Sequence, residues 1–239
     1  MLDDPPGRSA LPRHIGIVAV SPEGSSHCYR LIGRRAAEVT PRENRPRVTL
    51  HNQPFSSYVE ALEQGDWASI ASMLVESAHV LHAAGADFLV LPDNVCHHAL
   101  PLAEGHSPIP WLNMVHLVAE AVEASGTKRV GVIGTKYVTY GATYQTVLGL
   151  RGIRLLVPEP EETDRIDRII FHELVRGHVT AESRRLVLDS VRRLADRGCE
   201  ALIVGTTEAS SLFGAEECPL PVYDPVHLLV DAAIRRALA

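Results

Sequence analysis

Two short polar clusters follow apolar runs in the two halves of the chain, and their side chains are of types that transfer protons. The first, after the run at 87–91, comprises Asp93, Asn94, Cys96 and His97, and the second, after the run at 201–204, comprises Thr206, Thr207 and Glu208. A carboxylate such as Asp93 acts as a general base when burial raises its pKa towards neutrality. The hydroxyl of Thr206 has too high a pKa for that role, so we expect it to position a ligand by a hydrogen bond.

Cys96 is a second, weaker candidate for the catalytic group. It lies three residues after Asp93 on the first turn of an expected helix, where the helix dipole would lower the pKa of a thiol. Alternatively, a lone cysteine in an apolar setting is a small core residue. Asp93, Cys96 and His97 could also ligate a metal ion, but the second half offers only Glu208 and Asp224 as further ligands, so we expect no metal.

Other polar residues stand at the ends of expected strands and could contact a ligand. Thr135 and Lys136 follow the run at 129–134, and the Thr135 hydroxyl together with a backbone N–H could hold a carboxylate. Asn52 ends another expected strand and is a weaker candidate. Glu208 could recognise an amino group or, equally, stabilise the N-terminus of a helix.

The elements that must position these residues alternate along the chain. The expected strands are 14–20, 47–51, 87–91, 129–134, 153–157, 201–204 and 221–223, and the expected helices are 26–38, 67–84, 114–125, 140–150, 164–176, 181–197 and 226–238. Asp66 and Thr180 are expected N-caps, and Gly85, Gly126 and Gly198 are expected to end helices. Several strands are apolar throughout, which is typical of strands covered on both faces. The pattern predicts an α/β fold with mostly parallel sheets.

The order of elements also repeats. Arg-His-Ile-Gly-Ile-Val at 13–18 and Lys-Arg-Val-Gly-Val-Ile at 128–133 begin 115 residues apart, and Asp93 and Thr206 are separated by 113. We therefore expect two similar, pseudo-twofold lobes, 14–112 plus 221–239 and 113–220, after a loose tail at 1–13. Ligands of parallel sheets bind outside the carboxyl ends of the strands, so both polar clusters should face one cleft between the lobes. The alternative is that both are ordinary turns rich in capping residues.

Composition excludes several classes of protein. The chain of 239 residues has a net charge of −6 and no basic run, which disfavours nucleic acid as a partner. No apolar stretch approaches the roughly 18 residues of a membrane span, and the polar, Pro-rich start does not resemble a signal peptide. The four cysteines form no CxxC pair, which suggests reduced thiols and a cytoplasmic protein. Nucleotide-binding glycine motifs are absent, so no such cofactor is expected.

Six segments, in order, resemble the cofactor-independent aspartate/glutamate racemases of the Asp/Glu/hydantoin racemase superfamily. They are IGIVAVSPEGSS from Ile15, GADFLVLPDNVCHHA from Gly85, RVGVIGT from Arg129, RIDRIIFHELVRG from Arg165, ALIVGTTEASS from Ala201 and PLPVYDPV from Pro219. The resemblance implies a small carboxylate or amino-acid substrate, proton transfer at its α-carbon, no cofactor and a homodimer. It also implies that Ser21, in the first segment, contacts substrate.

The chain departs from that family where the chemistry is concentrated. The family uses a cysteine from each lobe, one before Asn and one before Thr-Glu, and these positions are Asp93 and Thr206 here. The family positions at Asn94, His97, Thr135, Thr207, Glu208 and Asp224 are retained. By resemblance, Asn94, Thr135, Thr207 and Glu208 would bind substrate and His97 would support the turn.

The resulting prediction is a racemase or isomerase that uses an unusual Asp93/Thr206 pair. Because only one member of that pair is a base, a decarboxylase or other lyase of the same fold is an open alternative. A catalytically inactive relative that binds a small acid is another.

Overall fold

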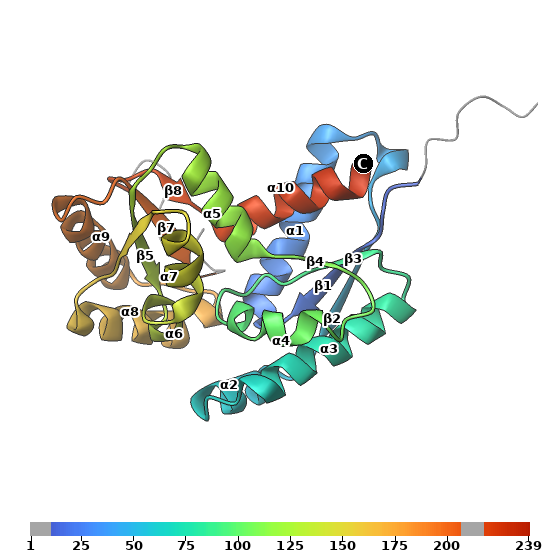
Figure 1. Ribbon diagram of the computed structural model, residues 1–239, viewed down its shortest axis with the longest axis horizontal. Helices are drawn as coiled ribbons and strands as arrows, with labels where there is room; N and C mark the ends of the chain where they lie inside the picture. Colours follow the sequence, from blue (N-terminus) through green and yellow to red (C-terminus); the bar gives the residue numbers. More distant parts are fainter. Residues whose placement is uncertain (1–10, 207–217) are drawn as a thin grey trace, which may run out of the picture.

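The computed structural model describes residues 11–206 and 218–239 and contains two sheets of four parallel strands (Figure 1). The strand orders are β2-β1-β3-β4 and β6-β5-β7-β8. The strands are β1 (Ile15–Ala19), β2 (Val48–Asn52), β3 (Phe88–Val90), β4 (Trp111–Leu112), β5 (Arg129–Gly134), β6 (Arg154–Leu156), β7 (Ala201–Gly205) and β8 (Val222–Tyr223). The predicted α/β class with two similar parallel lobes is confirmed.

The central strands are apolar because helices cover both of their faces. In β1, Ile15 and Ile17 pack with α1 (Pro22–Val39) and α10 (Pro225–Leu238). The alternate residue Val18 packs on the other face against α3 (Trp67–Ala83). Every residue of β1 and β7 is buried, as expected for strands that cannot expose either face to water.

The remaining helices complete the two layers around each sheet. They are α2 (Phe55–Glu63), α4 (Leu100–Glu104), α5 (Met114–Ala124), α6 (Lys136–Thr139), α7 (Ala142–Gly149), α8 (Pro160–His172) and α9 (Ala181–Asp196), with short 3-10 turns η1 (Arg42–Asn44), η2 (Cys96–His98) and η3 (Leu174–Arg176). The sequence analysis missed α2, α4, α6 and β4, and its expected helix at 164–176 joined α8 and η3, which the structure separates. No helix in the described part of the chain is long and apolar enough to span a bilayer.

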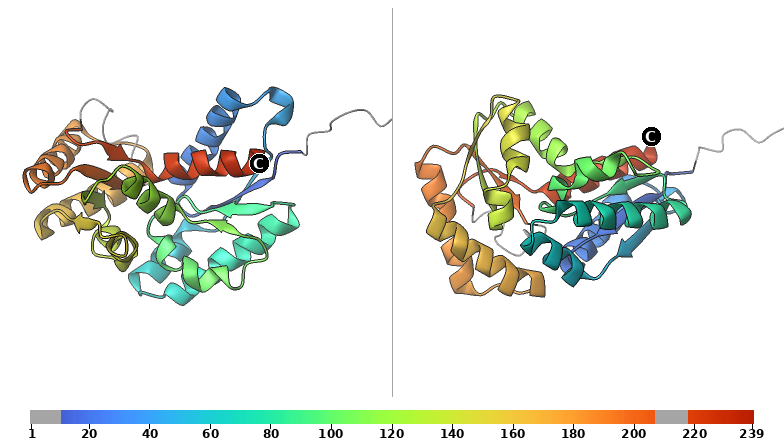
Figure 2. Two further views of the ribbon diagram at one scale, coloured as in Figure 1. Left: turned by 45° about the horizontal axis from the view of Figure 1, so that its top comes forward. Right: turned by 60° about the horizontal axis from the view of Figure 1, so that its bottom comes forward.

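The two halves exchange a helix at their junctions. α5 follows β4 of the first sheet but packs against the second sheet, and α10 follows β8 of the second sheet but packs against the first. In Figures 1 and 2, α10 runs from one lobe onto the other beside α1. Residues 221–223 were expected in the first lobe; this is corrected, because β8 pairs in parallel with β7. The other expected lobe boundaries remain predictions.

Local signals set the helix ends as expected. Asp66 accepts a hydrogen bond from the Ser69 N–H, and Thr180 accepts one from the Ser183 N–H, so both are N-caps. Gly85, Gly126 and Gly198 have positive φ, the conformation in which glycine ends a helix. At the start of the described chain, the Arg13 N–H donates to the carbonyl of Ala237 (2.8 Å), so this residue of the expected tail is tied to α10.

Candidate active site

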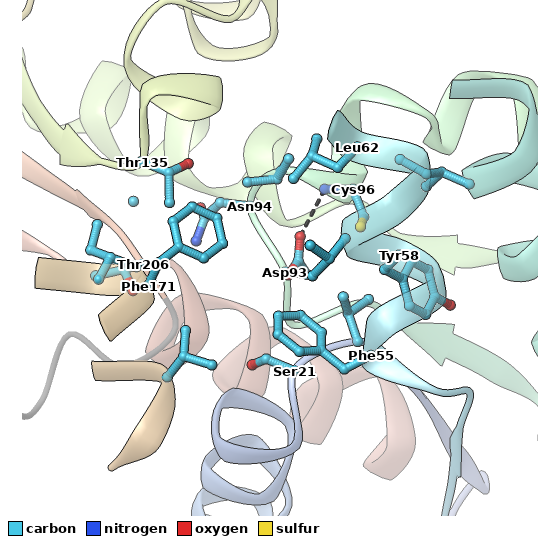
Figure 3. Close-up of a pocket in the computed structure, with 17 residues that line it drawn as sticks. Ser21, Phe55, Tyr58, Leu62, Asp93, Asn94, Cys96, Thr135, Phe171 and Thr206 are labelled. Atoms are coloured by element: carbon cyan, nitrogen blue, oxygen red, sulfur yellow. Dashed lines mark hydrogen bonds between the residues drawn. The ribbon is translucent and has the colours of Figure 1, made fainter. Parts of the chain in front are cut away.

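A pocket of about 70 Å³ lies where the central strands of both sheets end (Figure 3). Ser21 follows β1, Asp93 follows β3, Thr135 follows β5 and Thr206 follows β7, and all four line it. Figure 3 shows Asp93 and Cys96 on one side and Thr135 and Thr206 on the other. The two polar clusters predicted to share a cleft are therefore brought together, as far as residue 206. Thr207 and Glu208 lie outside the described residues.

Two glycines allow the second lobe to present its threonines. Gly134 and Gly205 are register partners at the ends of β5 and β7. A Cβ on Gly205 would lie 2.7 Å from Val138 Cγ1, and one on Gly134 would lie 2.9 Å from the Gly205 carbonyl oxygen. Any larger residue would push the strand ends and α6 apart. The repeated Gly-Thr pair thus places two buried hydroxyls beside each other in the fold.

Asp93 is held by the turn that follows it. Its Oδ1 accepts a hydrogen bond from the Cys96 N–H at 2.7 Å, and its side chain is half-buried. This bond ties the Asp93 side chain to Cys96, the first residue of η2. The backbone N–H of Cys96 thereby holds the carboxylate in its place at the pocket.

Cys96 does not have the depressed pKa that its place on a helical turn suggested. Burial, followed by the charge of Asp93 and a hydrogen bond to it, raises the pKa of the thiol well above its ordinary value. The helix dipole has little effect on this thiol, because η2 is a 3-10 turn of only three residues. Cys96 packs in the core cluster of the first lobe with Tyr58 and Val20.

Among the described residues that line the pocket, three have a buried polar atom without a hydrogen-bond partner: Tyr58 Oη, Asn94 Nδ2 and Thr135 Oγ1. The Tyr58 hydroxyl points away from Asp93 (Figure 3), which leaves Asn94 Nδ2 and Thr135 Oγ1, and both of these residues are about 95% buried. The other end of the Asn94 amide is satisfied, because Oδ1 accepts a hydrogen bond from the Tyr144 hydroxyl at 2.7 Å. That bond directs the NH₂ group to the pocket. An unpaired buried donor is costly, so these two atoms mark a place for an acceptor.

His97 supports the turn and is not a pocket group. Its Nε2 accepts the Met114 N–H (3.0 Å), so Nδ1 carries the proton and donates to the Asp93 carbonyl (2.6 Å). Burial lowers the pKa of His97 to about 4, so the ring is neutral at pH 7. It ties the Asp93 turn to the first turn of α5.

Some predicted contacts are not made. Asn52 ends the edge strand β2, is exposed, and does not line the pocket. The Lys136 N–H donates to Asp167 Oδ1 at 2.9 Å, so it does not hold a pocket ligand together with the Thr135 hydroxyl. No group of three His, Cys, Asp or Glu side chains suited to a metal occurs within residues 11–206 and 218–239.

The sequence analysis missed the apolar wall of the pocket. Phe55, Tyr58 and Leu62 come from α2, while Ile170 and Phe171 come from α8. The α2 residues recur at i, i+3 and i+7, a helical spacing that was readable in FSSYVEALE. Tyr144, the partner of Asn94, had no local signal because the two residues are 50 positions apart.

A model of the Asp/Glu/hydantoin racemase family matches residues 17–233. The chain belongs to this family. Several solved structures of racemases and their homologues have a similar fold. A putative Asp/Glu racemase from Yersinia pestis is 26% identical with a TM-score of 0.85, covering 95% of this chain and 100% of its own. An aspartate racemase homologue from Pyrococcus horikoshii OT3 is 23% identical, with a TM-score of 0.82 and coverage of 95% and 100%.

A more distant relative shares the fold alone. Glutamate racemase from Francisella tularensis, solved with D-glutamate, is 15% identical with a TM-score of 0.65, covering 92% of this chain and 79% of its own. The resemblance drawn from six sequence segments is thus confirmed, and family membership supports a racemase-type function. In this family member, Asp93 and Thr206 both line the pocket.

Proposed function

We propose that this racemase-family chain is a cofactor-independent isomerase that transfers a proton at the α-carbon of a small amino acid or other carboxylate. Asp93 is the base on one wall, and Thr206 is a hydrogen-bonding group on the other. The observation that carries the proposal is the shared pocket of Asp93 and the two unpartnered groups, Asn94 Nδ2 and Thr135 Oγ1.

The chemistry follows from what those groups can donate and accept. Asn94 Nδ2 and Thr135 Oγ1 donate to the substrate carboxylate. Asp93 removes the α-proton and becomes a neutral carboxylic acid, while the electron pair of the C–H bond delocalises into the substrate carboxylate. Charge on that carboxylate grows in the transition state, so donors already in place stabilise it more than the ground state. The Cys96 N–H keeps Asp93 aligned during the transfer.

Return of a proton decides the product. Delivery to the face opposite Asp93 inverts the centre, and delivery from Asp93 itself regenerates it. Thr206 is a hydroxyl and not a base, and this asymmetry favours a second candidate, a decarboxylase or other lyase with one-sided protonation. The proposed homodimer rests on the family resemblance alone, and the proposed cytoplasmic location rests on composition alone.

The test is proton NMR in D₂O with amino acids, other small carboxylates and substituted malonates. We expect the α-proton signal of a substrate to disappear, or a malonate to release carbon dioxide. The rate of either reaction should be about 10² to 10⁴-fold lower in the Asp93→Asn variant. Asn can still accept the Cys96 N–H, so the turn should persist. Asp189→Asn, on α9 and outside the pocket, is the matched control and should react at the wild-type rate.

Each alternative has its own outcome. Optical rotation of the product separates racemisation from one-sided exchange. Unchanged exchange in Asp93→Asn would exclude this residue as the base. Binding without exchange or decarboxylation by the wild type would favour an inactive small-acid-binding relative.

A further inference from the structure

The pocket is lined by both polar and apolar side chains. The polar residues include Asp93, Asn94 and the two threonines described above. The apolar wall is formed by Phe55 and Leu62 of α2, on the side of Asp93, and by Phe171 of α8, on the side of Asn94 and Thr206 (Figure 3). A substrate whose carboxylate binds Asn94 and Thr135 would have its α-substituent against these apolar side chains.

Within residues 11–206 and 218–239, the pocket lining offers no positive charge to a second acidic group. The described residues that line the pocket include no Lys, Arg or His, and their one carboxylate is Asp93. The segment 207–217, TEASSLFGAEE, also contains no basic residue and has three glutamates. The side-chain carboxylate of a dicarboxylate would therefore be desolvated against aromatic rings without a counter-charge, which is strongly unfavourable.

We propose that the substrate is an α-carbon acid with one carboxylate and a compact, uncharged apolar side chain, and that Phe55, Leu62 and Phe171 determine this specificity. The proposal rests on the proposed function for its assignment of the carboxylate end. The volume of about 70 Å³ for the whole pocket is several times the roughly 10–15 Å³ that holds one water, which limits the substrate to a small molecule with a compact side chain. Burial of that group displaces water from the wall and stabilises the complex.

Two isosteric ligand pairs test the proposal. Leucine and aspartate differ only in exchange of an isopropyl group for a carboxylate, and 4-methylpentanoate and succinate are their counterparts without the amino group. Both enantiomers of each amino acid are titrated by calorimetry at pH 7.5. We expect the apolar member of at least one pair to bind about tenfold or more tightly than its acidic partner. Equal, reversed or undetectable binding in both pairs would overturn the proposal.

A charge introduced into the wall should change the preference. Phe171 is half-exposed on α8, so Arg can be accommodated there. Phe171→Arg is expected to lower the apolar-to-acidic affinity ratio by about tenfold, whereas the control Phe171→Leu should keep the apolar preference. A ratio unchanged by Phe171→Arg would exclude Phe171 from specificity. The wild-type ratio decides the main proposal even if this variant does not fold.

The same samples separate this proposal from the proposed function. Tighter binding of the apolar ligands without Asp93-dependent exchange would support the substrate class and refute the proton transfer. Asp93-dependent exchange of aspartate in preference to leucine would support the proton transfer and refute the substrate class.

Discussion

Asp93 and Cys96 stand three residues apart in one turn, and their surroundings give them different chemistry. The carboxylate of Asp93 accepts the Cys96 N–H and faces the pocket. The thiol is buried beside that negative charge, and both burial and the charge favour its neutral form. Because the thiolate and not the thiol is the nucleophile and base, the neutral thiol of Cys96 is poorly suited to either role at pH 7.

The predicted behaviour of Cys96 follows directly. In the folded protein at pH 7.5, iodoacetamide should leave Cys96 unmodified, and urea-unfolded protein should be alkylated there within minutes. Peptide mass spectrometry reads out both states. If native Cys96 were alkylated rapidly, and bound substrate prevented this, the thiol would again be a candidate catalytic group.

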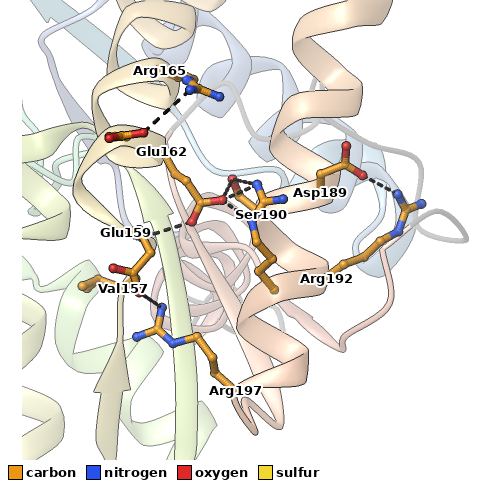
Figure 4. A network of polar contacts seen from close by, with 10 residues as sticks. Val157, Glu159, Glu162, Arg165, Asp189, Ser190, Arg192 and Arg197 are labelled. Carbon is orange, nitrogen blue, oxygen red and sulfur yellow. Dashed lines mark hydrogen bonds and ion pairs between the residues drawn. The ribbon is translucent and has the colours of Figure 1, made fainter.

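Helix α8 carries one side of the pocket wall, and the carboxylate of Glu162, whose side chain is 12% exposed, connects it to α9. Glu162 accepts hydrogen bonds from Ser190 Oγ (3.0 Å) and Arg193, and also from the Glu159 N–H in a capping box (Figure 4). Burial raises the pKa of Glu162, but the Glu159 N–H, Arg193 and Ser190 together lower it below its usual 4.5. The position of Ile170 and Phe171 therefore depends on a charge two to three turns away along the helix.

Glu162→Gln should lower the free energy of unfolding by about 1–2 kcal/mol at pH 7, measured by urea denaturation. A lowered pKa in the folded state stabilises the protein above pH 4.5 and ceases to do so as the pH falls below that value, so the difference from wild type should shrink at pH 3.5. The control is Glu161→Gln, because Glu161 is exposed and its ion pair with Arg165 is long (3.9 Å). An equal decrease in the free energy of unfolding in the two variants would contradict this role of Glu162 in joining α8 to α9.

The two lobes are joined by side chains as well as by the exchanged helices. Tyr144 of α7 donates to Asn94, and His97 of the first lobe accepts the N–H of Met114 in α5. Both bonds end on the turn that holds Asp93. The hydrogen bonds that join the lobes therefore also hold the turn that carries Asp93. His97 must be neutral to take part, because its Nε2 accepts a hydrogen bond.

The stability of the whole molecule should therefore depend on pH through His97. Its pKa falls from 6.5 to about 4 on folding, so this stabilisation is complete above pH 6.5 and is lost as the pH falls to about 4. The contribution is on the order of 3 kcal/mol. His97→Gln, which keeps an acceptor for the Met114 N–H, should be less stable at pH 7 but show a flatter dependence between pH 6.5 and 4. Parallel pH curves for variant and wild type would refute the role of His97.

Much of the framework was readable in the chain because it depends on local and periodic signals. The apolar runs predicted central strands covered on both faces, and the repeat predicted two lobes with Asp93 and Thr206 at matched strand ends. Capping residues such as Asp66 and Thr180 act within three or four positions of themselves. These predictions needed no knowledge of distant partners.

The remaining features depend on residues that meet only after folding. Neither the unpartnered amide of Asn94, oriented by Tyr144, nor the raised pKa of Cys96 could be derived from spacing, because hydrogen bonding and desolvation are set by packing. Asn52 ends a strand as the pattern suggested, but β2 is an edge strand, and Asn52 is exposed and does not line the pocket. Strand β8 joined the second sheet because a two-residue strand is defined by its partner β7 and not by its own sequence. The apolar wall required two helices from different lobes to meet, and short-range sequence patterns carry no information about such a meeting.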